Sequence, residues 1–149
     1  MSQTYFGSAL RSGSGTLTDT TDGGYVVLEQ TTTVTTVAAG TAVSSTLTLP
    51  SGSQIINLFL DTMVTPVVGG GTATTCNVTV GTAAAGTQYL SATDAIAGGR
   101  VALSFTTAQC AAMADIGTNT SVVVTVDPNG TVSTTQGVFR LTVVYAQKG

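Results

Sequence analysis

The stretch Val138-Phe139-Arg140-Leu141-Thr142-Val143-Val144-Tyr145 decides the fold class of this 149-residue chain. Large apolar or aromatic side chains fall at every second position, at Phe139, Leu141, Val143 and Tyr145, while Arg140 and Thr142 fall between them. Successive side chains of a β-strand point to opposite faces of a sheet. This period of two therefore predicts a strand with one face in a core and the other directed away from it.

Seven further runs rich in Val, Thr, Leu and Ile precede this strand, and Gly, Asn, Pro and Ser separate them. Such spacing is typical of a sandwich or barrel, and helical periodicity is almost absent. The expected strands are residues 25–37, 43–49, 54–64, 72–80, 88–92, 100–105, 121–126 and 138–145. The run at 121–126 is uniformly apolar, which predicts a strand covered on both faces by another sheet or another subunit. We expect an all-β fold, a jelly-roll or Greek-key β-sandwich of about eight antiparallel strands.

Two turn sequences are expected to close hairpins. Asp127-Pro128-Asn129-Gly130 has the residue preferences of a type I turn, and Pro50-Ser51-Gly52-Ser53 is expected to play the same role. One short helix is predicted over residues 107–113. Thr106 and Gln109 fit a capping box, and the alanines that surround Gln109 favour helix.

The chain divides into a flexible amino-terminal arm, residues 1–23, and one β-domain, residues 24–149. Ser12-Gly13-Ser14-Gly15 gives the arm the composition of a flexible linker. Apolar side chains gather near its start, which predicts that this part docks on a partner. The expected partner-binding residues are Tyr5, Phe6, Leu10 and Arg11.

Charged residues make up only 7% of the chain, about a quarter of the usual ~25%. Four cations, Arg11, Arg100, Arg140 and Lys148, cannot form a basic stripe, so we expect no nucleic-acid partner. The amino terminus lacks a secretion signal, and no apolar stretch approaches ~18 residues, so no membrane partner is expected. Low charge is typical of packed assemblies or extracellular surfaces.

The sequence contains no histidine, which removes the commonest general base and the Ser-His-Asp arrangement. The seven acids are scattered, so a small glycosidase or lyase is a disfavoured alternative. Asp61 shares a strand face with Ile55, Asn57 and Phe59, and we expect a structural ion pair with a strand arginine, Arg100 or Arg140. No acidic cluster has the spacing of a calcium loop. We therefore expect no catalytic residue, no cofactor, no metal and no enzyme activity.

Cys76 and Cys110 are too few and too far apart for a disulfide framework or a CxxC metal site. Free cysteine behaves as a small hydrophobe, so two reduced and mostly buried thiols are expected. A single bridge between Cys76 and Cys110 is the alternative.

Several segments after residue 40 follow one another in a recognisable order and style. They are Ser45-Thr46-Leu47-Thr48-Leu49-Pro50-Ser51-Gly52, Asn77-Val78-Thr79-Val80-Gly81-Thr82-Ala83, Tyr89-Leu90, Gly99-Arg100-Val101, residues 106–113 and Arg140-Leu141-Thr142-Val143-Val144-Tyr145. In these segments the chain resembles the decoration, or cement, proteins of tailed-bacteriophage capsids. The resemblance implies a jelly-roll or sandwich fold and a homotrimer that binds the major capsid protein. It also implies synthesis in the host cytoplasm and a final place on the capsid surface of the virion.

The expected function is that of a non-enzymatic virion structural protein, a decoration protein that binds the outside of the phage head and stabilises contacts between capsomers. The alternative is a head fibre, tail or spike component that binds a host glycan or another virion protein. Sugar binding uses aromatic faces, and four Tyr, four Phe and no Trp offer few of them.

Overall fold

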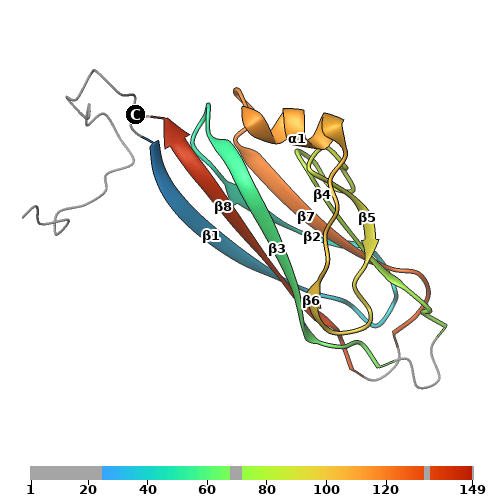
Figure 1. The fold of residues 1–149 in the computed structure, drawn as a ribbon. Helices are drawn as coiled ribbons and strands as arrows, with labels where there is room; N and C mark the ends of the chain where they lie inside the picture. Colours follow the sequence, from blue (N-terminus) through green and yellow to red (C-terminus); the bar gives the residue numbers. More distant parts are fainter. Residues whose placement is uncertain (1–24, 68–71, 133–134, 149) are drawn as a thin grey trace, which may run out of the picture.

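The computed structural model describes residues 25–67, 72–132 and 135–148, which form eight strands and one short helix (Figure 1). In chain order they are β1 (Tyr25–Thr35), β2 (Val43–Thr48), β3 (Gln54–Val64), β4 (Cys76–Gly81), β5 (Leu90–Asp94), β6 (Gly99–Val101), α1 (Thr107–Ala114), β7 (Ser121–Pro128) and β8 (Val138–Lys148). The proposed arm, residues 1–23, lies outside the described residues.

Each strand of the first half pairs with its mirror-image strand of the second half. β1 pairs with β8, β2 with β7, β3 with β6 and β4 with β5, all antiparallel. Two more pairs, β3 with β8 and β4 with β7, complete two four-stranded sheets. Sheet A has the order β1-β8-β3-β6, and sheet B has the order β2-β7-β4-β5. A long antiparallel ribbon wound into two facing sheets gives this order, so the predicted jelly-roll sandwich is confirmed.

The core lies between the two sheets and follows the alternation that the sequence predicts. Phe139, Leu141 and Val143 of β8 are at most 1% exposed, and Arg140 and Thr142 between them are half-buried on the other face of sheet A. The inward side chains of β8 form one cluster with those of sheet B, which include Val78, Val80, Val122, Val124 and Val126. Burying each such side chain contributes roughly 1.5–3 kcal/mol.

β7 is buried on both faces, as its uniformly apolar sequence predicts. Its inward valines are buried in the core, and its outward Val123 and Thr125 are also buried. The connection between β4 and β5 reaches this outer side, where the Ala85 N–H donates a hydrogen bond of 2.8 Å to Oγ1 of Thr125. A connection of the same chain therefore supplies cover over the outer face of β7.

Neither predicted turn closes a hairpin, so that expectation was wrong. Asp127 and Pro128 continue β7, because they pair with Asn77 and Cys76 of β4. The turn at residues 50–53 does form, with a hydrogen bond of 3.3 Å from the Ser53 N–H to the Pro50 carbonyl. It joins β2 to β3, however, and those strands lie in different sheets, as β7 and β8 do.

Helix α1 begins with the predicted capping box and lies at one end of the sandwich (Figure 1). The Gln109 N–H donates to Thr106 Oγ1 at 3.2 Å, and the Thr106 N–H donates to Gln109 Oε1 at 2.9 Å. Gln109 and Met113, which are four residues apart on one side of the helix, are buried. Gln109 Nε2 also donates to the Thr87 carbonyl, which fastens the helix to the β4–β5 connection.

At the other end of the sandwich, backbone hydrogen bonds hold the long connections together. The N–H groups of Thr72 and Ala73 donate to the Thr131 carbonyl at 3.1 and 3.2 Å. Gly130 lies beside this contact with a φ of +116°, and a Cβ there would lie 2.6–2.7 Å from backbone atoms of Thr72 and Ala73. Only glycine fits at this position without movement of the neighbouring backbone.

Candidate functional site

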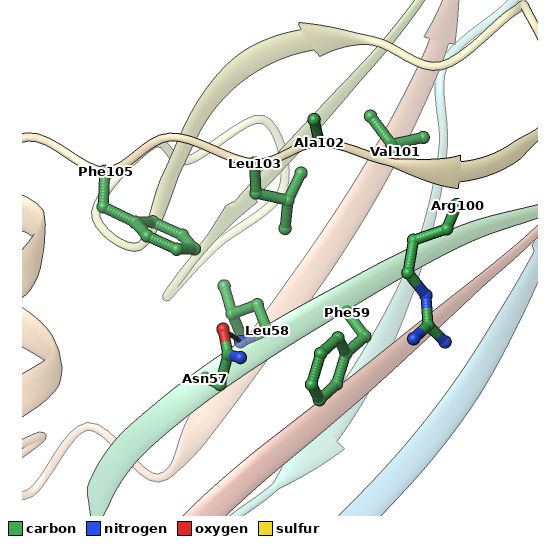
Figure 2. Close-up of a pocket in the computed structure, with 8 residues that line it drawn as sticks. All are labelled: Asn57, Leu58, Phe59, Arg100, Val101, Ala102, Leu103 and Phe105. Carbon is green, nitrogen blue, oxygen red and sulfur yellow. Dashed lines mark hydrogen bonds between the residues drawn. The ribbon is translucent and has the colours of Figure 1, made fainter.

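An open groove of about 350 Å³ runs along the edge of sheet A, between β3 and residues 100–105 (Figure 2). It exists because β6 pairs with β3 over three residues only, from Leu60↔Val101 to Thr62↔Gly99. Beyond Val101 the two segments separate. The lining residues are Asn57, Leu58, Phe59, Arg100, Val101, Ala102, Leu103 and Phe105.

The strand predicted over residues 100–105 ends at Val101, and a bulge in its partner strand lies opposite the far end of the predicted strand. The same register would place Phe105 opposite Ile56, which is the extra residue of a bulge in β3. A bulge interrupts the ladder of hydrogen bonds. Burial still alternates in this segment, because Leu103 and Phe105 are half-buried against the core while Ala102 and Ser104 are exposed.

The edge of β3 beside the groove has no partner strand among the described residues except β6, which pairs with residues 60–62. Within the described ranges, β3 pairs on this side only through residues 60–62, and no backbone hydrogen bond joins residues 102–105 to it. The Leu58 N–H donates to the side-chain Oδ1 of Asn57 at 2.9 Å. A side chain of β3 itself therefore occupies one backbone donor of this edge.

Asp61 lies between two arginines next to the groove, on the outer face of sheet A. The three residues are directly opposite one another in the strand register, Arg100 on β6 and Arg140 on β8. Arg100 Nε lies 2.8 Å from Asp61 Oδ1, and Arg140 Nη2 lies 2.8 Å from Asp61 Oδ2. The predicted structural ion pair is confirmed, and both arginines take part in it.

The shared carboxylate stays ionised at ordinary pH. Hydrogen bonds from Arg100 and then Arg140 lower the pKa of Asp61 from 3.8 to about 2, against the opposing effect of burial. One negative charge faces two positive charges, so the cluster carries a net charge of +1. The Arg100 side chain is 62% exposed and that of Arg140 is 39% exposed, so both guanidinium groups can also reach solvent.

Arg100 brings this charge to the aromatic lining of the groove. Its guanidinium carbon lies 4.9 Å from the centroid of the Phe59 ring, a cation–π geometry. Figure 2 shows Arg100, Leu103 and Phe105 extending from one segment towards β3, with the Arg100 side chain beside the Phe59 ring. The groove thus places an apolar wall, an aromatic face and a cation within one small site.

Replacing Asp61 with Asn is expected to lower the free energy of unfolding by about 1–3 kcal/mol at pH 7, because two guanidinium groups lose their shared carboxylate. The folded-state pKa of Asp61 lies below the unfolded one. Its stabilisation is therefore complete above about pH 5 and is lost as pH falls towards 2. Urea unfolding of both proteins between pH 7 and pH 2 measures this difference.

The matched control is Glu29→Gln, which removes an exposed carboxylate from the same face of sheet A. The Glu29 variant should differ from the parent by less than about 0.5 kcal/mol. The difference between Asp61→Asn and the parent should shrink steadily as the pH is lowered. A difference of equal size at pH 7 and pH 2 would contradict the assigned role of the carboxylate.

Both cysteines are free, as expected, and no bridge joins them. Cys76 is buried, and burial followed by the nearby carboxylates raises the pKa of its thiol to about 12. Cys110 is exposed, so the expectation that both thiols are mostly buried was wrong. Gln109 and Met113 occupy the buried side of α1, which leaves Cys110 on the solvent side.

The four predicted partner-binding residues, Tyr5, Phe6, Leu10 and Arg11, lie outside the described residues, so the structure does not place them. Within residues 25–67, 72–132 and 135–148, no group of three or more His, Cys, Asp or Glu side chains could hold a metal ion. No helix in those ranges has the length and apolar character needed to cross a bilayer.

Sequence reasoning missed the groove, although it placed Phe59 on the same strand face as Asp61. A large aromatic side chain next to a charged one on a sheet face is the signal that could have drawn attention to this edge. Phe105 carried no such signal, because its alternation with Leu103 and Val101 is typical of an ordinary strand.

No protein-family model, curated protein or solved structure matches this chain. The resemblance to phage decoration proteins therefore rests on the sequence segments alone.

Proposed function

We propose that the protein is a non-enzymatic virion structural protein, a decoration or cement protein of a tailed phage. In this role it binds the major capsid protein on the outside of the head as a homotrimer and stabilises contacts between capsomers. It is made in the host cytoplasm and ends on the capsid surface. The resemblance described above suggests this role. The jelly roll, a fold that capsid, lectin and cupin domains all use, is compatible with it without selecting it.

The observation that carries the proposal is the outer face of sheet A, which suits a protein interface. Threonines line it, and Oγ1 of Thr31 lies 3.0 Å from Oγ1 of Thr142. Val27 and Met63 of this face are both more than half exposed. Its charged side chains described in the structure are two of each sign, Glu29, Asp61, Arg100 and Arg140. Arginine and aromatic side chains are enriched at protein interfaces, and this face carries Arg100, Arg140 and Phe59.

The proposed mechanism is mechanical. Two hydrogen-bonded sheets around one core form a body that resists deformation, and a trimer presents three copies of each contact surface. Several weak contacts made together give an avidity far above that of one contact. The arm residues Tyr5 and Phe6 would add contacts to a neighbouring capsomer. The assembly would thereby oppose the outward pressure of the packaged genome.

Cosedimentation with expanded heads, built from the major capsid protein of the same genome, tests this role. Light scattering of the free protein should give the mass of a trimer. Deleting residues 1–23 should leave the fold intact and weaken head binding. Thr31→Glu should weaken head binding by at least about tenfold, because an unpaired charge on an interface is costly to desolvate. Thr46→Glu, an exposed position on β2 of sheet B, is the matched control and should bind as the parent does.

A monomer without affinity for heads would refute the proposed function. If Thr31→Glu and Thr46→Glu bind heads equally well, the outer face of sheet A does not contact the head. Reproducible glycan-array hits without head binding would instead favour the head fibre, tail or spike alternative.

A further inference from the structure

We propose that the groove beside β3 binds a short extended segment of a partner protein, which adds its backbone to the free edge of β3 and places a carboxylate against Arg100. This inference goes beyond the role on a phage head and does not depend on it. It rests on three properties of the groove: a free strand edge, apolar side-chain positions and an excess of positive charge.

The first property is the unpaired backbone of β3. An edge strand presents N–H and C=O groups that can pair with an incoming strand. Residues 102–105 leave this edge open, and the one donor occupied there, the Leu58 N–H, is held only by the side chain of Asn57. An incoming strand can replace that contact, since the Asn57 amide can turn towards solvent or towards the new backbone.

The second property is the apolar lining on both sides of the opening. Leu103 and Phe105 are half-buried against the core, and Phe59 is half-buried on the outer face of sheet A. Alternate side chains of an extended segment point to opposite faces, so one could lie against Phe105 and the next against Phe59. The volume of about 350 Å³ lies at the lower end of the range for ligand pockets, which limits the segment to a few residues.

The third property is the charge at the mouth of the groove. The Asp61 carboxylate accepts hydrogen bonds of 2.8 to 3.3 Å from Nε and Nη2 of both Arg100 and Arg140. In the described part of the chain, Nη1 of Arg100 and Nη1 of Arg140 donate no hydrogen bond. Arg100, which lines the groove, therefore keeps a donor for a second carboxylate, from an Asp, a Glu or a chain end, and the cluster of Asp61 and the two arginines carries the positive charge that attracts it.

Backbone complementarity decides between a peptide and other anionic ligands. An acidic sugar could contact the arginines and the Phe59 ring, but it would leave the N–H and C=O groups of the β3 edge without strand partners. An extended peptide satisfies the edge, the apolar positions and the charge together. We therefore assign the groove to a peptide segment.

The test is a titration of the ¹⁵N-labelled full chain with the peptide Ac-Val-Thr-Val-Asp-Val-Thr-NH₂, monitored by amide chemical shifts. We expect shifts confined to β3 residues near the groove and to residues 100–105. The same peptide with Asn in place of Asp should bind about tenfold more weakly, because it loses a charged hydrogen bond. A version methylated at alternate backbone nitrogens should lose binding, because it cannot pair with β3.

Arg100→Gln should bring the affinity for the Asp peptide close to that for the Asn peptide, while Glu29→Gln should leave the preference unchanged. If Arg100→Gln does not fold, the comparison of the three peptides on the parent chain still decides the matter. Absence of localised shifts, equal binding of the Asp and Asn peptides, or unchanged binding of the methylated peptide would overturn the proposal. Shifts at the same residues with glucuronate and none with the peptides would assign the groove to an acidic sugar instead. No capsid enters this experiment, so its failure leaves the proposed function standing.

Discussion

Leu141→Asp is expected to abolish folding at 25 °C. Leu141 is 1% exposed at the centre of β8, where it pairs with Thr32 on one side and Leu60 on the other. The substitution removes a buried leucine, which costs about 2–5 kcal/mol, and it also places an unpaired carboxylate in the core. The sum is comparable with the whole stability of a domain, about 5–15 kcal/mol. Far-UV circular dichroism and urea unfolding would show the loss of the cooperative transition.

The matched control is Thr33→Asp, which places the same carboxylate on the exposed face of sheet A opposite Arg140. A cross-strand pair of opposite charges there keeps the change within about 1 kcal/mol. The two variants differ only in which face of the sheet receives the charge. A cooperative transition of Leu141→Asp near that of Thr33→Asp would mean that the inner and outer faces are wrongly assigned.

Gly130→Ala is expected to lower the free energy of unfolding by about 2–4 kcal/mol. The added Cβ would meet the backbone of Thr72 and Ala73, and the φ of +116° is unfavourable for any L side chain. Neither neighbour can move without disturbing the hydrogen bonds to Thr131. Equilibrium denaturation in urea measures the loss.

Gly117→Ala separates the two causes. Gly117 also has a positive φ, +56°, but a Cβ there would meet no atom within 4 Å. This control should lose only about 1 kcal/mol, the cost of the backbone conformation alone. Losses of equal size in the two variants would show that the connections at this end move apart freely.

The fold class was predictable because its signals are local. The alternation of Phe139, Leu141 and Val143 needs only a sheet with one buried face, and the capping box of Thr106 and Gln109 needs only a helix start. Which strands pair with one another is not encoded in such local signals. The Pro50 turn reverses the chain in either arrangement, so its residues do not reveal that β2 and β3 belong to different sheets.

The candidate site was only partly predictable, because no residue of the segment 100–105 marks the end of its pairing with β3 after Val101. Alternation in the sequence places Ile55 on the same face as Asn57, Phe59 and Asp61. The bulge at Ile56 breaks the alternation, so Ile55 is buried while Asn57 and Phe59 line the outer groove. A bulge has no marker in this stretch, since Ile56 is as apolar as its neighbours. The pairing of Asp61 was predictable because a charge in an apolar strand requires a partner.

The pairing of β1 with β8 has a consequence for how the chain reaches its native state. Among the four pairs β4–β5, β3–β6, β2–β7 and β1–β8, only β4 and β5 are close in sequence. The sequence separation grows from each pair to the next, and it is largest between Tyr25 of β1 and Lys148 of β8. Structures dominated by such distant contacts fold slowly, on the scale of milliseconds to seconds. During synthesis β1 emerges first, yet it has no partner until β8 has left the ribosome. Among the strands that the structure describes, the one made earliest therefore waits longest for its partner, with its edge open to other chains.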